Sequence, residues 1–148
     1  MLNGPPLTEI AEEHLEREDA LLYEANRYLF TDTNAQTTYI FSLYYHGKAD
    51  NRLIDYANAA SSRYDLVFLC DMDIPYDDTW DRSGDGNRQV FQQQIVGDLA
   101  VRKVPYFILR GSVEVRIACV KRVLSHFRKY GNLLDTISAL LPMLGPLP

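Results

Sequence analysis

The sequence has few of the residues that build disulfide frameworks, zinc clusters or membrane spans. Its 148 residues include two cysteines and three histidines, and His14, His46 and His126 lie far apart. Neither a disulfide scaffold nor a zinc site is therefore indicated. No apolar run approaches the roughly 20 residues that a membrane helix needs, and no signal peptide opens the chain. We expect a protein of a reducing, cytoplasmic compartment that does not act at a membrane.

The composition fits one domain of ordinary size. Hydrophobic residues make up 47% of the chain, which is enough to build a core. The formal net charge of −5 argues against nonspecific nucleic-acid binding. We divide the chain into a domain over residues 1–131 and an apolar tail over 132–148, which is predicted to pack back or to bind a partner.

The most informative stretch runs from Tyr64 to Arg88. Residues 66–70 form an unbroken apolar run, which predicts a strand buried on both faces, as in a parallel sheet. A loop rich in aspartate follows, and its proline and glycines oppose regular structure. Ligands of open α/β sheets bind at the carboxyl ends of strands, so we expect a mobile, functional loop here.

Strand and helix patterns alternate along the chain and predict an α/β fold with a mainly parallel sheet. We expect Leu22 and Ile117 to face the core, and Thr8, Asp50 and Asn87 to cap helices. Three strands are few for a chain of this length. The predicted strands cover residues 28–31, 66–70 and 104–109, and the predicted helices cover 8–27, 36–46, 51–61, 87–102 and 112–131.

The segment Leu29 to Asp32 has the form of a Walker B element, an apolar strand that ends in an aspartate. Such a carboxylate holds Mg²⁺ beside bound phosphates. The alternative is an aspartate that only caps the following helix or turn. Thr37 and Thr38 follow at once, and they either contact substrate hydroxyls or simply open a helix.

The loop from Asp71 to Arg88 suits a lid that closes over phosphates and excludes water. Arg82 is its best functional candidate, because a permanently charged guanidinium can neutralise a transferring phosphoryl group. Arg88 either assists or stabilises the next helix. The alternative is a solvated loop whose charges pair among themselves. The last helix carries five basic residues, Arg116, Lys121, Arg122, Arg128 and Lys129. Three or four of them are interpreted as surface residues that complement the helix C-terminus, and no special role is predicted for the set.

Three segments in this order, YLFTDTNAQTT, YDLVFLCDMDIPYDDTWDRSGDGNR and VPYFILRGSVEVR, carry a resemblance. Over about Leu7 to Phe127 the chain resembles the P-loop domain of NadR-type ribosylnicotinamide kinases. The resemblance implies a P-loop NTPase-like three-layer sandwich with a mainly parallel sheet. It also implies ATP-dependent phosphoryl transfer to the ribose hydroxyl of a nicotinamide riboside, with Mg²⁺.

The same resemblance assigns roles by position. Asp32 would be the metal-linked or base-like acid, and Arg82 the lid arginine of the catalytic site. Asn34, Thr38 and Asp78 would lie on the substrate side. Arg82, Arg88, Gly111 and Ser112 would lie on the nucleotide side, the last two near the adenine. The family commonly has a second acid where this chain has Asn34 and a tryptophan where it has Tyr76.

The sequence contains no GxxxxGK[ST] motif, the glycine-rich loop that cradles phosphates. Its one Gly-Lys pair, Gly47 and Lys48, precedes Ala49 and follows no strand. We therefore expect the later part of such a domain, without its first strand and P-loop and with little activity. A missing N-terminal segment or pairing of two copies would complete the sheet. The alternatives are a noncatalytic interaction protein and a regulatory ATPase.

Overall fold

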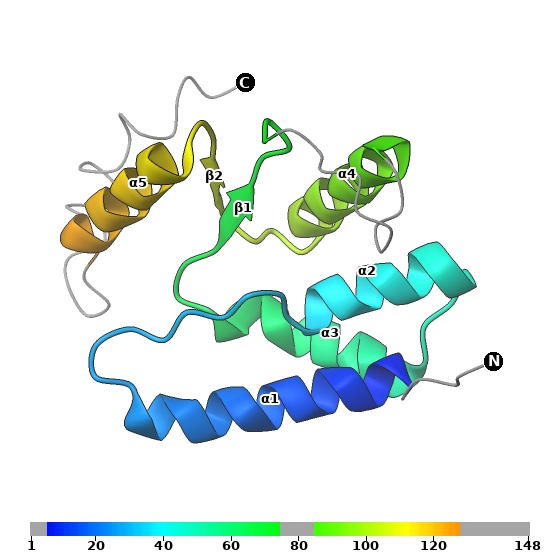
Figure 1. Ribbon diagram of the computed structural model, residues 1–148. Coiled ribbons are helices and arrows are strands. Elements are labelled where there is room, and N and C mark those ends of the chain that lie inside the picture. The colour runs from blue at the N-terminus through cyan, green and yellow to red at the C-terminus, as the bar shows by residue number, and fades with distance from the viewer. Residues whose placement is uncertain (1–5, 75–84, 128–148) are drawn as a thin grey trace. The chain divides into compact units, whose positions relative to one another are not determined.

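The computed structural model describes residues 6–74 and 85–127, and it is a mostly helical α/β structure with a small parallel sheet (Figure 1). The chain divides into two compact units. The helical unit is Met1–Tyr64 with Gly86–Val104, and the sheet unit is Asp65–Asp85 with Pro105–Pro148. The elements are α1 (Leu7–Glu24), α2 (Ala35–His46), α3 (Asn51–Arg63), β1 (Phe68–Cys70), α4 (Asp85–Val101), β2 (Phe107–Leu109) and α5 (Val113–His126).

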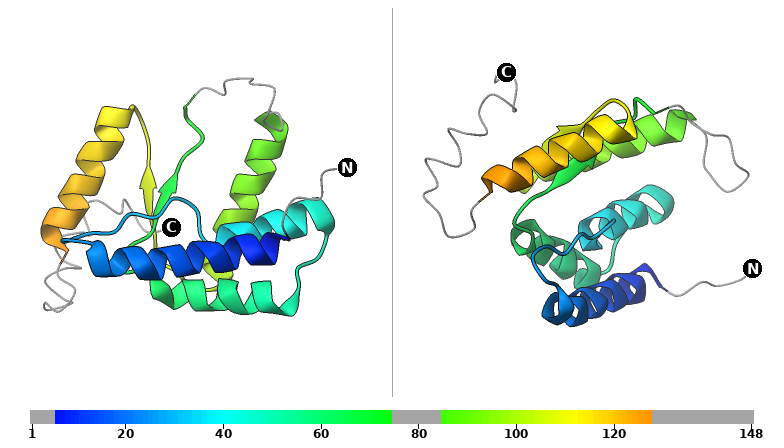
Figure 2. Two further views of the ribbon diagram at one scale, coloured as in Figure 1. Left: turned by 60° about the horizontal axis from the view of Figure 1, so that its bottom comes forward. Right: turned by 60° about the vertical axis from the view of Figure 1, so that its left-hand side comes forward.

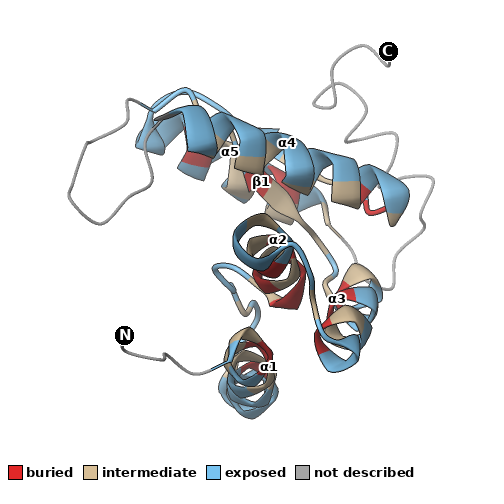
Figure 3. Cartoon of the chain, turned by 90° about the vertical axis from the view of Figure 1, so that its right-hand side faces the viewer, coloured by how far each residue is buried: buried red, intermediate tan, exposed pale blue. Residues whose placement is uncertain are grey.

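The helical unit is built around three packed helices. Helices α1 and α3 run in the same direction, and α2, which lies between them in the sequence, runs in the opposite direction (Figure 1). Their buried residues face one another, and four of them form the core cluster: Ala11, Ala35, Leu53 and Ala60 (Figure 3). Three of the four are alanines, and larger, partly buried side chains pack against the cluster, namely Leu7, Tyr39, Tyr56 and Tyr64.

The ends of these helices follow local sequence rules. Asn34 caps α2 by accepting a hydrogen bond from the Thr37 N–H, and Gly47 ends it in the left-handed conformation with φ of 67°. Asp50 caps α3, as predicted. The prediction that Thr8 caps α1 is wrong, because Pro6 occupies that position and the Thr8 hydroxyl donates to the Asp50 carboxylate instead.

The sheet unit contains a two-stranded parallel sheet of β1 and β2, and the parallel direction agrees with the mainly parallel sheet that was predicted. Phe68 pairs with Phe107, and their ring centroids lie 5.7 Å apart. A turn of three residues, 110–112, then leads from β2 into α5 (Figure 2). Burial on both faces was a wrong prediction, since Cys70 and Ile108 are exposed.

Other sequence predictions also need correction. Residues 28–31 form no strand in the structure, because a β-ladder needs a neighbouring strand and these residues have none in the described chain. Helix α4 begins at Asp85, so Asn87 lies inside it, and α5 ends at His126, before Gly131. Leu22 and Ile117 are exposed rather than inward-facing. Within the described ranges no helix is long and apolar enough to cross a membrane.

Candidate functional site

The carboxyl ends of β1 and β2 carry the main polar cluster of the sheet unit. The Asp71 N–H donates to the Leu109 carbonyl at 2.9 Å, which continues the strand pairing by one residue. Arg110 Nε donates to the Asp71 carboxylate at 2.5 Å. This bond, together with one from the Met72 N–H, lowers the pKa of Asp71 below its ordinary value. A charged acid and a charged arginine therefore lie where α/β sheets bind ligands.

A second acid in the same loop, Asp73, contacts the turn after β2. It accepts a hydrogen bond from the Gly111 N–H at 2.5 Å and forms an ion pair with Arg116 of α5. Arg116 also donates to the Gly111 carbonyl at 2.9 Å and to the Asp71 carbonyl at 3.3 Å. One guanidinium therefore joins the loop after β1, the turn after β2 and the first turns of α5.

Arg116 is buried, with 7% of its surface exposed, so it is not one of the surface residues of this helix, and predicting no special role for the whole basic set was wrong. The burial of Arg116 could have been predicted from the helical spacing of the sequence. Arg116 and Val123 are seven residues apart, which places them on one stripe of the helix, and Val123 is fully buried. A charged residue on a buried stripe needs partners, and Asp73 supplies the opposite charge.

The turn itself is tightly defined. Gly111 has φ of 83°, a conformation that residues with a side chain rarely adopt. Ser112 caps α5 by accepting from the Val115 N–H at 3.4 Å. A hydrogen bond from Ser112 also lowers the pKa of Glu114. Gly111 and Ser112, predicted on the nucleotide side, are thus brought together at the carboxyl end of β2, while their role stays a prediction.

The predicted substrate and metal residues near position 32 belong to the helical unit. Asp32 is exposed and is followed by Thr33 at φ of 62°, an unusual conformation for a β-branched residue. Asn34 is engaged as the α2 cap. Thr38 is buried, and its hydroxyl donates to the Asn34 carbonyl at 3.2 Å. The structure shows helix-stabilising contacts for Asn34 and Thr38, and their roles toward a substrate remain predictions.

Asp32 can be tested for its fit to Mg²⁺. The described residues contain no group of three or more histidine, cysteine or acidic side chains that could hold a metal ion. Mg²⁺ usually keeps several waters and takes only one or two protein carboxylates together with substrate phosphates. A single exposed aspartate two residues before the cap of α2 therefore fits an ion that arrives with ATP, and it does not fit a resident metal.

The remaining predicted site residues are less informative. Arg88 is half-buried near the start of α4 and already has an interaction partner. Asp78 and Arg82 lie outside the described residues, as do most of the predicted lid and the tail over 132–148. The domain boundary at residue 131 falls there as well.

Sequence reasoning missed a polar network that joins three helices of the helical unit. Asp98 of α4 accepts from the Gln36 amide and from Arg102 Nε, each at 2.7 Å. Arg102 also donates to Asn58 of α3 and lies over the Tyr39 ring. The charged groups of Asp98 and Arg102 are largely buried, so this network holds α4 to α2 and α3.

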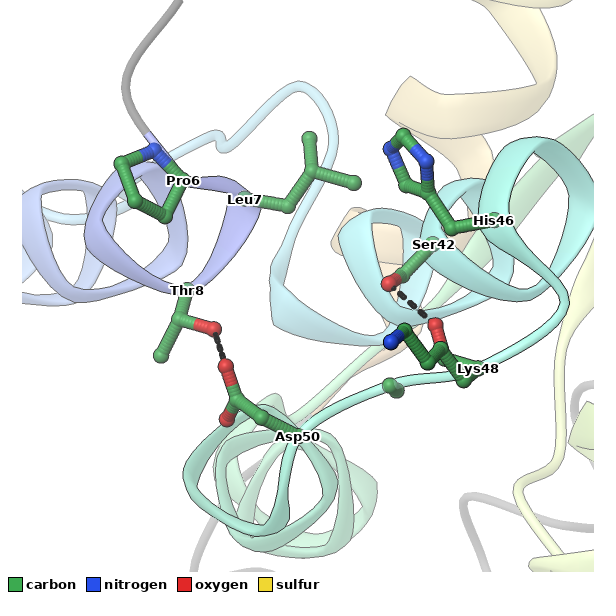
Figure 4. Close-up of a pocket in the computed structure, with 8 residues that line it drawn as sticks. Pro6, Leu7, Thr8, Ser42, His46, Lys48 and Asp50 are labelled. Carbon is green, nitrogen blue, oxygen red and sulfur yellow. Dashed lines mark hydrogen bonds between the residues drawn. The ribbon is translucent and has the colours of Figure 1, made fainter.

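The helical unit also has an open cleft of about 370 Å³ (Figure 4). The Thr8–Asp50 bond lies on one side of it, and a bond from the Ser42 hydroxyl to the Lys48 carbonyl, 2.7 Å long, lies on the other. The Thr8 bond is the main cause that lowers the pKa of Asp50. None of the predicted site residues lines this cleft.

Comparison with known families places the chain in the class of P-loop NTPases. Within that class it belongs to an AAA domain family, whose model matches residues 3–116. Proteins of this family typically bind ATP with Mg²⁺. No curated protein and no solved structure matches the chain. Family membership implies the P-loop NTPase fold, and it specifies neither a kinase reaction nor a substrate.

Proposed function

We propose that the chain carries the nucleotide-facing part of an ATP-dependent nucleoside kinase of the ribosylnicotinamide kinase type. The observation that supports this most directly is the turn Gly111–Ser112 at the carboxyl end of β2, where Gly111 is hydrogen-bonded through both its N–H and its carbonyl. Its place matches the rule for ligand sites in parallel sheets. Family membership supplies the nucleotide class, and the DxDIP segment ending in the Arg82 loop supplies the resemblance to nucleoside kinases.

In this proposal the residues act mainly by positioning and by electrostatics. Asp32 takes part in binding the Mg²⁺ that accompanies ATP, and Asn34, Thr38 and Asp78 lie on the nucleoside side. Arg82 neutralises charge on the transferring phosphoryl group, and Arg88 supports it on the nucleotide side. ATP supplies the phosphoryl group, and a ribose hydroxyl of the nucleoside accepts it.

The first experiment measures ATP binding by the 148-residue chain with Mg²⁺ and with EDTA. We expect binding that Mg²⁺ strengthens, and we expect Asp32→Asn to remove most of the Mg²⁺ dependence. Asp55→Asn is the matched control, because Asp55 is exposed on α3 within the same unit. Absence of ATP binding, or equal behaviour of both variants, would contradict the proposal.

The second experiment tests transfer of the γ-phosphate of ATP to nicotinamide riboside, with adenosine and uridine as competing acceptors. Transfer that falls strongly in Arg82→Ala while ATP affinity is kept would support the kinase reaction. A second candidate function is noncatalytic nucleotide or partner binding. It is favoured by residues 28–31, which form no strand in the structure, because a Walker B aspartate stands at the end of one. Mg²⁺-dependent ATP binding without any transfer would support this candidate.

A further inference from the structure

The open cleft of the helical unit has no role in the proposed kinase reaction. It is lined by residues from the start of α1, from the end of α2 and from the loop before α3 (Figure 4). Its volume of about 370 Å³ lies at the small end of the range for ligand pockets, which begins at roughly 300 Å³. The cleft is therefore large enough for a small molecule, and the chemistry of its lining determines which kind.

The hydroxyl groups of the lining already have partners inside the protein. Thr8 donates to the Asp50 carboxylate, and Ser42 donates to the Lys48 carbonyl at 2.7 Å. Thr8 and Ser42 are also buried. Because a hydroxyl has one proton to donate, neither can donate to a ligand without breaking its present bond. The side-chain groups that stay available to a ligand are therefore mainly the charged ones.

Two opposite charges line the cleft without pairing with each other. Only Ala49 separates Lys48 from Asp50, yet neither forms an ion pair within the described ranges. Figure 4 shows the side-chain nitrogen of Lys48 directed toward the side of the cleft on which Thr8 and Asp50 lie. Asp50 accepts from the Thr8 hydroxyl and from the Leu53 N–H at 2.9 Å. A carboxylate can accept about four hydrogen bonds, so Asp50 keeps room for a further donor.

The rest of the lining is largely apolar. Leu7 lies on the α1 side of the cleft and the His46 ring on the α2 side, and Pro6 and Ala49 add further carbon surface (Figure 4). Leu7 and Ala49 are half-buried, so a short apolar group placed against them would lose contact with water and be stabilised. A ligand that matches the whole lining therefore combines a negative group, a positive group and a few carbon atoms.

We propose that the cleft binds a small zwitterion, a molecule such as a free amino acid with a carboxylate, an ammonium group and a short apolar part. The carboxylate of the ligand pairs with Lys48, its ammonium group pairs with Asp50, and its apolar part packs on Leu7. A ligand with one charge only would match one of these two groups and bring a like charge close to the other. The inference goes beyond the proposed kinase reaction and does not depend on it.

The test uses the full 148-residue chain and three ligands that differ only in charge. Leucine is the zwitterion, isocaproate is leucine without its ammonium group, and isoamylamine is leucine without its carboxylate. Affinities are measured by NMR titration, which suits weak binding, and the backbone N–H signals of Leu7 and Ala49 report from the cleft. ATP binding is measured separately, so failure of the proposed function and failure of this inference are distinguishable.

Two variants each remove one charge of the cleft, Lys48→Met and Asp50→Asn. Asparagine caps helices as well as aspartate does, so Asp50→Asn keeps the start of α3. The matched controls are Arg17→Met and Asp55→Asn, which remove the same charges from exposed positions of α1 and α3 outside the cleft. Thermal unfolding of each variant shows that the helical unit is still folded.

We expect leucine to bind the unaltered chain about fivefold more tightly than either analogue, because each exposed ion pair contributes modestly. Lys48→Met is expected to weaken leucine about fivefold, to the affinity of isoamylamine, while isoamylamine itself is not weakened. Asp50→Asn is expected to weaken leucine to the affinity of isocaproate, while isocaproate itself is not weakened. The controls Arg17→Met and Asp55→Asn are expected to change none of the three affinities.

Four results would overturn the inference. Absence of any shift at Leu7 and Ala49 with all three ligands would show that the cleft binds none of them. Equal affinities of the three ligands for the unaltered chain would show that the two charges do not select a zwitterion. An equal loss of all three ligands in Lys48→Met or Asp50→Asn would assign the loss to a changed shape of the cleft. A loss of leucine binding in the controls as large as in the cleft variants would indicate nonspecific attraction by the protein surface.

Discussion

The two units differ in where they place their polar side chains. In the helical unit many polar bonds of the described residues join one helix to another, as do those of Glu12, Glu18 and Asp98. In the sheet unit they gather at the carboxyl ends of two short strands and hold a turn and a loop. Hydrogen bonds between helices stabilise the packing of those helices, whereas hydrogen bonds around a turn fix the backbone conformation of that turn. In the described residues, the helical unit therefore uses its polar bonds to join helices, and the sheet unit uses them to hold one turn and the loop after β1.

The largest expected loss of stability comes from truncating a buried side chain in the core of either unit. Leu53 is 1% exposed in the helical unit, and Leu53→Ala should cost about 2–5 kcal/mol. Val123→Ala in the sheet unit should cost about 2 kcal/mol, since it removes two carbon atoms. Chemical unfolding with hydrogen exchange resolved by region measures both. If the comparison holds, each variant loses protection mainly in its own unit, and equal loss in both units would contradict it.

Glycine substitutions give the next largest effect. Gly47→Ala and Gly111→Ala each force a side chain into a left-handed conformation, which costs about 1–2 kcal/mol. Gly111→Ala should cost more, because its new Cβ would lie 3.4 Å from Val115 Cγ1 while nothing lies near Gly47. Gly97→Ala is the control in the helix interior, and it should stabilise by about 0.5–1 kcal/mol. Melting curves of the three variants measure these changes in stability. A loss of stability in Gly97→Ala would show that a clash with neighbouring side chains outweighs the gain in helix propensity.

Helix caps provide a smaller contrast between the units. Asn34 accepts from Thr37 at 3.1 Å, and Asn34→Ala should destabilise by about 1 kcal/mol. Ser112 accepts from Val115 at the longer distance of 3.4 Å, so Ser112→Ala should cost only about 0.5 kcal/mol. Urea unfolding of both variants is the measurement. A larger loss at Ser112 would mean that its bond to Glu114 matters more than the cap.

The smallest expected effect is on the acid sensitivity of each unit. Asp50 and Asp71 both have pKa values below their ordinary 3.8 in the folded state, owing to Thr8 and to Arg110 respectively. The unfolded chain therefore takes up these protons first as the pH falls. The stabilisation is complete above about pH 5 and is lost as the pH falls below 3.8 and through the folded pKa values.

Asp50→Asn should make the stability of the helical unit depend less on pH, and Asp71→Asn should do the same for the sheet unit. Region-resolved hydrogen exchange between pH 5 and pH 3 would follow this, with Asp55→Asn as the control. An acid dependence that neither variant changes would assign the effect to other carboxylates.

Local rules were the most predictable part of the fold. Gly47 ends α2 and Asp50 begins α3 because these signals depend only on neighbouring residues. Strands at residues 68–70 and 107–109, in a parallel sheet, were also predictable, since both are apolar runs followed by polar loops. The turn at Gly111 and Ser112 was predictable from these two residues themselves, whereas its contacts with Asp73 and Arg116 were not.

Features that depend on distant residues were not predictable from one sequence. Residues 28–31 have strand-like composition, but a strand exists only where a neighbour accepts its hydrogen bonds. Leu22 and Ile117 follow helical periods, yet a period identifies a face and does not show that another element covers it. Arg116 is the clearest case, because its burial depends on Asp73, which lies in another loop.

The parallel course of α1 and α3 has a consequence for folding kinetics. Their polar bonds join Thr8 to Asp50, Glu12 to Arg52 and Tyr56, and Glu18 to Arg63 and Tyr64. Every one of these bonds spans 40 to 46 residues of chain. The first contact to form bears the entropy of closing that loop, and the others then add almost none. These bonds raise the contact order of the unit above that of a bundle whose contacts join only neighbouring helices, and we expect it to fold more slowly for that reason.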